Sequence, residues 1–370
     1  RDESQRLALA AFVARKVAEE ELAKLPPPVQ VYAAATKVDV LLAVGQGTST
    51  TVAAPKVVHV LKRGDFDKPL KEVTSGALSA ISSLPARFSE LQSSDEGARR
   101  AALANWLADT KNPLTWRSIA NRVWHYHFGR GLCDTPNDFG RMGGLPSHPE
   151  LLDWLASELR DGGGSLKHLH RLIVTSGTYR QSSSHRDDAA SIDADNRLLW
   201  RMNRLRLDAD CYRDFVLAAA DRLDLTLGGP SVKQFVTGPP VQLTPTLDYN
   251  AYDWAVLPKH RRSIYRFVWR GVPDPFMEVL DFPDLGMLAP TRSISSSALQ
   301  SLALYNNRFV LHFSDEMAKQ LQTPEEAARR ILLRELTDSE QILTAAYIQK
   351  HGLAAFCRVL LNSNEFLFVD

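Results

Sequence analysis

The chain has 370 residues, a formal net charge of +1, 44% hydrophobic residues and 24% charged residues. This length and composition are typical of a globular protein with one or two domains. The near-zero net charge gives no general electrostatic reason to expect nucleic acid or a membrane surface as a partner. Because no run of 18 apolar residues occurs, we expect no transmembrane segment.

Residues 1–25 have the pattern of one charged amphipathic helix. Three prolines follow at 26–28, and a proline triplet ends a helix and favours an extended linker. We therefore expect residues 1–28 to be a helix and Pro-rich linker that come from, or dock against, an upstream region. The runs VQVYAA, VDVLLAV and KVVHVLKRG favour short strands, so residues 29–92 are predicted to contain a small β element.

Residues 93–370 are predicted to form a mainly helical domain. The fold class of the whole chain is therefore mainly α (α+β): a helical body with a small β element and long structured loops. One helix is expected in DEGARRAALANWLAD, and another is expected to begin at the N-cap Asp208. Loops and strands are expected from 227 to 275. Later helices are expected to begin at three further N-caps, which are Ser297, Thr323 and Thr337.

The segment 112–181, called the polar block below, contains five of the ten histidines and three of the seven tryptophans. Helical periodicity predicts helices at 113–128, 148–160 and 165–175 that pack against one another. Their expected N-caps are Asn112, Ser147 (as part of a capping box) and Ser165. On the first helix the apolar residues share one face, and Arg117, Asn121 and His125 share another. On the third, Leu166 is expected to face inward with the other leucines.

Polar side chains are denser in this block than a helical core requires. Seven of them are predicted to line a pocket for a small ligand, namely Asn121, His125, Arg130, Asp138, Arg141, His148 and Arg171. Arg130 and Arg141 can instead clamp Asp138 or bind an acidic ligand. No HExxH, GxSxG or phosphate-loop pattern occurs in the chain, so those enzyme classes have no support.

Metal binding in the polar block has only a weak basis. His125 and His127 are two residues apart on a helix, so their side chains point about 200° apart and cannot reach one ion. The same holds for His168 and His170. The oxygens of three loop residues are weak calcium candidates, namely Asp134, Asn137 and Asp138. Asx turns around Pro136 explain the same residues equally.

Tyr249, Tyr252 and Trp254 lie near Asp248 and Asp253, in a segment expected to be irregular. Such a mixture of rings and carboxylates suits stacking against a sugar, and it also suits a loop that is pinned to the core.

The three cysteines are isolated in the sequence, at Cys133, Cys211 and Cys357. None forms CxxC or the CxxCH pattern that attaches haem, so we expect no cofactor in this chain. Small buried thiols are the simplest interpretation. In an exported protein one disulfide could form, which would leave one thiol free.

Several separated blocks have a familiar pattern: NPLTWRSIANRVWHYHFGRGL (112–132), TPNDFG (135–140), SHPELLDWLA (147–156), NRLLWRMNRLRLDA (196–209), RRSIYRF (261–267) and ALQSLALYNNRFV (298–310). They resemble the C-terminal domain of unknown function in planctomycete proteins that usually follows a planctomycete cytochrome C domain. At the position of Arg308 that family usually has proline. The segment 325–352 is also shorter here than in the family.

The resemblance implies an exported, periplasmic or extracellular multidomain protein whose haem c lies upstream of this chain. It carries no established activity. Two hypotheses follow. The first is a module with a pocket on the polar block for a carbohydrate or other small ligand. The second is a non-catalytic scaffold that docks upstream domains or a partner protein, with the polar block as a buried hydrogen-bond network.

Overall fold

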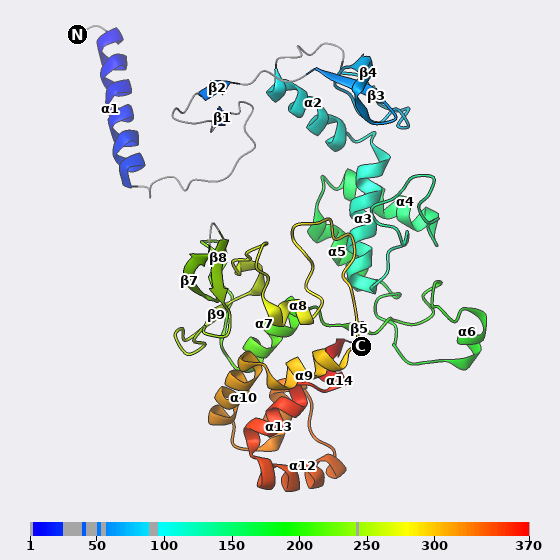
Figure 1. Ribbon diagram of the computed structural model, residues 1–370, viewed down its shortest axis with the longest axis vertical. Helices are drawn as coiled ribbons and strands as arrows, with labels where there is room; N and C mark the ends of the chain where they lie inside the picture. The colour runs from blue at the N-terminus through cyan, green and yellow to red at the C-terminus, as the bar shows by residue number, and fades with distance from the viewer. Residues whose placement is uncertain are drawn as a thin grey trace. The chain divides into compact units, whose positions relative to one another are not determined.

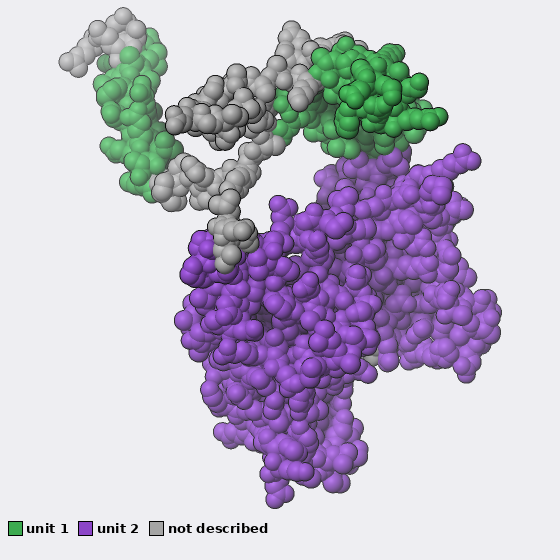
Figure 2. All heavy atoms as spheres, in the orientation of Figure 1, with its two compact units in different colours: residues 1–112 green, residues 113–370 purple. Residues whose placement is uncertain are grey.

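A computed structural model describes residues 3–24, 39–41, 50–52, 57–88, 95–241 and 244–369 (Figure 1). The chain divides into two compact units, residues 1–112 and residues 113–370 (Figure 2). Helices predominate in the part of the chain that the structure describes, and the strands form small two-stranded sheets. The predicted mainly α fold with a minor β component is therefore confirmed.

In its described residues the first unit contains two helices and two pairs of antiparallel strands. Their bounds are α1 Glu3–Lys24, β1 Asp39–Leu41, β2 Thr50–Val52, β3 Val58–Lys62, β4 Asp65–Val73 and α2 Glu96–Ala108. The predicted first helix is α1, and the expected strands in VDVLLAV and KVVHVLKRG are β1 and β3. The run VQVYAA lies outside the described residues. Arg63 and Gly64 both have positive φ between β3 and β4, as a tight hairpin turn requires.

The second unit begins with three helices that form one core. These are α3 Pro113–Phe128, α4 Pro149–Asp161 and α5 Leu166–Thr175. Trp124 and Phe128 stack at 4.1 Å between ring centroids and pack with Leu155, Leu169 and Ile173. The predicted packing of these three helices is confirmed, because their apolar stripes repeat at helical spacing and must be buried together.

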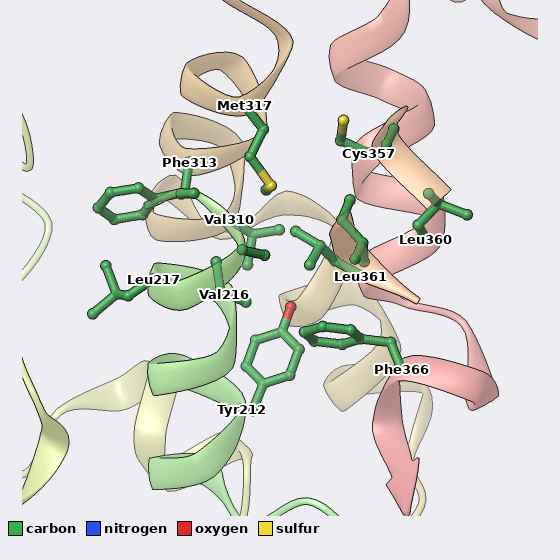
Figure 3. Close-up of a cluster of buried hydrophobic side chains, with 14 of the residues drawn as sticks. Tyr212, Val216, Leu217, Val310, Phe313, Met317, Cys357, Leu360, Leu361 and Phe366 are labelled. Atoms are coloured by element: carbon green, nitrogen blue, oxygen red, sulfur yellow. The ribbon is translucent and has the colours of Figure 1, made fainter. Parts of the chain in front are cut away.

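A second core lies in the C-terminal half of the same unit. It gathers residues from helices α7 Ala209–Ala219, α9 Ala298–Asn306, α10 Arg308–Gln320, α11 Pro324–Ile331, α13 Leu353–Leu361 and α14 Asn364–Leu367. Figure 3 shows Tyr212 of α7 beside Phe366, with which it makes an edge-to-face contact at 5.8 Å. Val310 and Leu361 come from α10 and α13, which pack against each other.

The remaining elements are one longer helix and several short helices and strands. They are α6 Asp187–Ile192, β5 Leu205–Arg206, β6 Leu223–Asp224, β7 Val236–Val241, β8 Thr244–Asp248, β9 His260–Arg261, the 3-10 helix η1 Ser263–Tyr265, α8 Pro275–Val279, α12 Asp338–His351 and β10 Phe368–Val369. The expected mixture of loop and strand between 227 and 275 is confirmed. β6 and β9 are parallel, whereas β5 and β10 are antiparallel and bring the end of the described chain back to residue 205.

Most predicted helix caps are confirmed. The side chains of Ser165, Ser297, Thr323 and Thr337 each accept a backbone N–H three residues later. Thr337 also forms a complete capping box with Glu340. Each cap satisfies one of the N–H groups that the first helical turn leaves unpaired.

Asp208 is the N-cap residue of α7, as predicted, although its side chain accepts no backbone N–H of the first turn, and one of its oxygens lies 3.7 Å from Arg292. Two local predictions are wrong. Ser147 does not begin a capping box: its hydroxyl donates to the carbonyl of Leu132, and His148 is the N-cap of α4. Leu166 is 48% exposed, because it is the first residue of α5 and lies before the turn that the core covers.

No helix among the described residues is long and apolar enough to cross a membrane.

Candidate functional site

Asn121 is sealed inside the polar block. Its side chain is fully buried. Its amide nitrogen donates to the carbonyl of Cys133, and its amide oxygen accepts from the N–H of Cys133, both at 2.8 Å. A Cβ at Gly131 would lie 2.8 Å from the same amide, so the loop passes too close for any residue except glycine. Asn121 therefore fastens the following loop to α3 instead of facing an open polar surface.

The other helical candidates of the block have separate surroundings. His125 is half-buried, and burial lowers its pKa although the nearby Asp208 carboxylate acts in the opposite direction. His148 lies with its Nδ1 3.0 Å from the Ser147 hydroxyl. Arg171 is exposed on α5. Within the described part of the chain, none of these three side chains hydrogen-bonds to another of the seven predicted pocket residues.

The loop that follows α3 satisfies its polar groups locally. Arg130 donates to Asp134 at 2.9 Å and thereby lowers the pKa of that carboxyl. Asn137 accepts from Arg122, and Asp138 accepts from the N–H of Gly140. The three calcium candidates thus accept hydrogen bonds from three different donors. Arg130 pairs with Asp134, and not with Asp138.

Arg141 is exposed at the far end of this loop. Arg130 and Asp134 also line a cavity of about 30 Å³, which is about the volume of one water molecule. The polar block therefore offers little enclosed space beside its predicted pocket residues.

Histidines on these helices contact side chains of a neighbouring helix. His127 Nε2 lies 2.7 Å from His170 Nδ1, and His168 Nε2 lies 3.2 Å from a Glu158 oxygen. Burial and the neighbouring His170 lower the pKa of His127. Among the residues that the structure describes, no group of three or more His, Cys, Asp or Glu side chains could hold a metal ion.

The three cysteines are free thiols. Cys133 and Cys357 are buried, as the sequence predicted, whereas Cys211 is exposed. Burial raises the pKa of Cys357 to about 12, so that thiol is unreactive at neutral pH.

The three aromatic candidates lie together but face different surroundings. Trp254 packs edge-on against Phe309 at 4.9 Å, and Tyr252 packs edge-on against Trp254 at 4.8 Å. The Tyr249 hydroxyl donates to the carbonyl of Val272 at 2.7 Å. Tyr249 and Trp254 both line a cavity. The irregular segment is therefore pinned to the second core, and it also forms part of a cavity wall.

Two cavities adjoin in the second unit and share part of their walls. Their lining residues include residues of α7, of α8 and of the segment after β8, and Figure 1 shows where these elements lie. The small cavity has a volume of about 60 Å³, and its walls include Arg213, Trp254 and Phe276. The large cavity has a volume of about 190 Å³, and its walls include Phe267, Trp269 and Phe282. The residues common to both walls are Tyr249, Arg266, Asp274 and Met277.

Arg213 is a charged residue that the fold carries into the interior. It is 2% exposed and lies on α7 between Tyr212 and Val216, two buried residues of the second core. Its Nη1 donates to Asp214, to the carbonyl of Arg261 and to the Ser263 hydroxyl. Burial and the nearby Arg266 lower the pKa of Arg213 to about 10, so the guanidinium remains protonated at neutral pH.

Arg266 lines both cavities. Its side chain is 6% exposed. It donates from Nε to Gln234 at 3.1 Å and from Nη2 to Asp274. Asp274 in turn accepts from the N–H of Phe276 and begins α8. This chain of contacts holds the α8 backbone against the segment after β9.

The small cavity has an excess of positive charge in its wall. Its charged lining residues are Arg213, Arg266 and Arg308, with Asp274 as the lining carboxylate. Arg308 is the first residue of α10 and donates to the carbonyl of Asn250. Chemically the site offers guanidinium donors for an anion and aromatic rings for an apolar or sugar face.

Sequence reasoning singled out Tyr249 and Trp254 here but missed the arginines. Two signals were available. On α7 the buried residues Ala209, Val216 and Leu217 follow helical spacing, and Arg213 falls on the same face. Arg308 occupies a position where proline is favoured, the first residue of a helix. A charged residue on the apolar face of a helix indicates a role for its side chain beyond core packing. An arginine at a position where proline is favoured indicates the same.

The architecture is that of a mainly helical domain with polar cavities in its C-terminal half. The chain belongs to the PSD1 family, which is described as a protein family of unknown function (DUF1553) and whose family model matches residues 99–348. Both the three-helix core and the paired cavities lie within that match. Comparison with curated proteins finds no match, and neither does comparison with solved structures.

Proposed function

We propose that this chain is a ligand-binding module for a carbohydrate or another small polar ligand, and that the paired cavities are its site. The observation that carries the proposal is the junction of the two cavities along Tyr249, Arg266 and Asp274. Ligand sites in proteins are concave, mostly lined by apolar and aromatic groups, and contain a few convergent polar groups. The sequence had directed this hypothesis to the polar block, where the enclosed space is smaller.

The large cavity suits a ring-shaped ligand. Its volume of about 190 Å³ is that of roughly six liquid water molecules. Phe267 and Trp269 lie 5.9 Å apart in its wall, and Glu278 and Asp284 add carboxylates. Aromatic faces bind the apolar face of a sugar, while carboxylates accept hydrogen bonds from its hydroxyls.

A glycan array followed by isothermal titration calorimetry tests the proposal. We expect one class of glycan to bind, and we expect Trp269→Ala to weaken that binding about tenfold because the stacking surface is lost. The matched control is Trp154→Ala, because Trp154 is 48% exposed on α4 and lines neither cavity. Equal effects of the two substitutions, or no binding to any glycan, would contradict the proposal.

The polar block supports a second function. We propose that it is a scaffold that holds upstream domains or a partner protein, because the sealed Asn121 amide is a structural bond and not an open binding group. Co-purification of a partner that depends on residues 113–181, and that survives Trp269→Ala, is the expected result. Loss of the partner on Trp269→Ala would assign the interaction to the cavities instead.

We also propose, on the family resemblance, that the module is exported and associated with a cytochrome, and that any haem c is attached outside this chain. Cell fractionation should place the protein in the periplasm or medium. Haem-stained denaturing gels should show covalent haem only on a longer polypeptide. A covalent haem signal on this chain alone would refute the haem part of the proposal. Recovery of the protein from the cytoplasm would refute the export part.

A further inference from the structure

One edge of the Arg213 guanidinium has no partner. Arg213 is 2% exposed, and its Nε and Nη2 are buried without a hydrogen-bond partner in the described structure. All three bonds that the side chain makes come from Nη1. Buried polar groups are nearly always paired in native proteins, so an unpaired charged edge beside a cavity indicates a ligand that pairs with it.

Elsewhere in this chain the same edge binds carboxylates. Arg117 donates from Nε and Nη2 to the two oxygens of Asp153, and Arg160 and Arg329 bind Asp161 and Glu335 in the same way. This two-point geometry is the one in which guanidinium and carboxylate fit best. In Arg213 the edge that these arginines use is the edge without a partner.

The size of the small cavity favours a carboxylate group over a larger anion. Its volume of about 60 Å³ corresponds to roughly two liquid water molecules. The wall contains three arginines and the Asp274 carboxylate, so its net charge is positive and suits an anionic group. The large cavity begins at the same Tyr249, Arg266 and Asp274 side chains and can hold the rest of the ligand.

We propose that the ligand is an acidic sugar, a uronate, whose carboxylate enters the small cavity and binds the Nε–Nη2 edge of Arg213 while its ring lies in the large cavity. The inference rests on the proposed ligand-binding function and specifies its substrate class. Arg308 at the rim is the second positive group for the same carboxylate, held in place by its bond to the Asn250 carbonyl.

Calorimetry with paired probes separates this inference from the proposed function. The probes are glucuronate and galacturonate, their methyl esters, and the neutral sugars glucose and galactose. We expect each acid to bind at least about tenfold more tightly than its ester and its neutral partner, because only the acid offers a charged two-point acceptor. Equal binding of acid, ester and neutral sugar would overturn the uronate inference and leave the ligand-binding function standing. No binding of any probe would overturn the inference, and the glycan array would then decide the function separately.

Variants locate the carboxylate. Arg213→Lys keeps a positive charge but removes the two-point edge, and it should abolish the preference for acid over ester. Because Arg213 also joins α7 to residues 261–263, Arg308→Gln is a second variant with less structural risk, and it should reduce the preference several-fold. Arg329→Gln removes one exposed arginine that lines neither cavity and should leave the preference unchanged. An unchanged preference in a folded Arg213→Lys and in Arg308→Gln, or tighter binding of glucose 6-phosphate than of glucuronate, would refute the assignment.

Discussion

The polar block and the paired cavities both concentrate charged and polar side chains, but they use them differently. In the block, Asn121 binds a backbone segment through both amide atoms, and Arg117 binds Asp153 through two donors. At the cavities, Arg213 has two buried donors without a partner. A high density of polar residues therefore does not by itself indicate a binding site, and the proposed ligand site rests on unpaired donors that lie beside a cavity.

The largest expected effect is the loss of the Trp124 side chain. Trp124 is buried and stacked on Phe128 in the three-helix core. Trp124→Ala should leave a cavity and lower the free energy of unfolding by roughly 3–5 kcal/mol. Chemical denaturation monitored by circular dichroism measures the change. His125→Ala, at the adjacent half-buried position, should cost only about 1 kcal/mol, and equal losses would make His125 a core residue as well.

Asp274 lines both cavities, and substituting it measures how much this part of the wall contributes to the stability of the fold. It pairs with the buried Arg266 and also begins α8. Asp274→Ala should lower the free energy of unfolding by about 2–3 kcal/mol, below the usual range for a broken buried pair because Asp274 is partly exposed. Asp274→Asn retains an N-cap acceptor and should cost less. If the two substitutions destabilise equally, the cap contributes nothing and the ion pair alone holds the wall.

Asn121→Ala removes the two hydrogen bonds that join α3 to the backbone of Cys133 in the following loop. The N–H and carbonyl of Cys133 would lose their partners inside the core, which costs roughly 1–3 kcal/mol. Ligand binding at the paired cavities should be unchanged. A loss of ligand binding without a loss of stability would show that the polar block contributes to the site, contrary to the distinction drawn above.

The smallest effect concerns pH. Burial lowers the folded-state pKa of His125 and His127 below the ordinary value of 6.5. A lowered pKa means that the unfolded chain takes up these protons first. The two residues therefore contribute stability above about pH 6.5, and this contribution is lost as the pH falls toward their folded pKa values. Replacing both with Gln should flatten the decline in thermal stability between pH 7 and pH 5. An unchanged decline would assign it to other groups.

The helices of the polar block could be predicted from the sequence because local rules govern them. Leu152, Leu155 and Leu159 repeat at helical spacing, and Ser165 and Thr337 cap the helices that follow. Ser147 was misassigned because its hydroxyl binds Leu132, a residue that is distant in sequence. A cap is predictable only where no tertiary partner competes for the same hydroxyl.

The cavities could not be predicted, because their walls come from separated parts of the chain. Arg213, Gln234 and Asp274 become neighbours only when α7, the segment before β7 and α8 are in place. Periodicity describes one element at a time. Tyr249 and Trp254 were identified from their residue types, but the unpaired edge of Arg213 depends on which of its donors other residues occupy.

The pairing of β5 with β10 sets an order of assembly during synthesis. Leu205 pairs with Val369, and the N–H of Leu207 donates to the carbonyl of Leu367 at 2.8 Å. The three-helix core uses contacts between residues close in sequence and can form while translation continues. The second core includes Phe366 and Leu367, so it can close only after these residues have left the ribosome. Until then the apolar face of α7 lacks part of its cover, and this half of the molecule folds last.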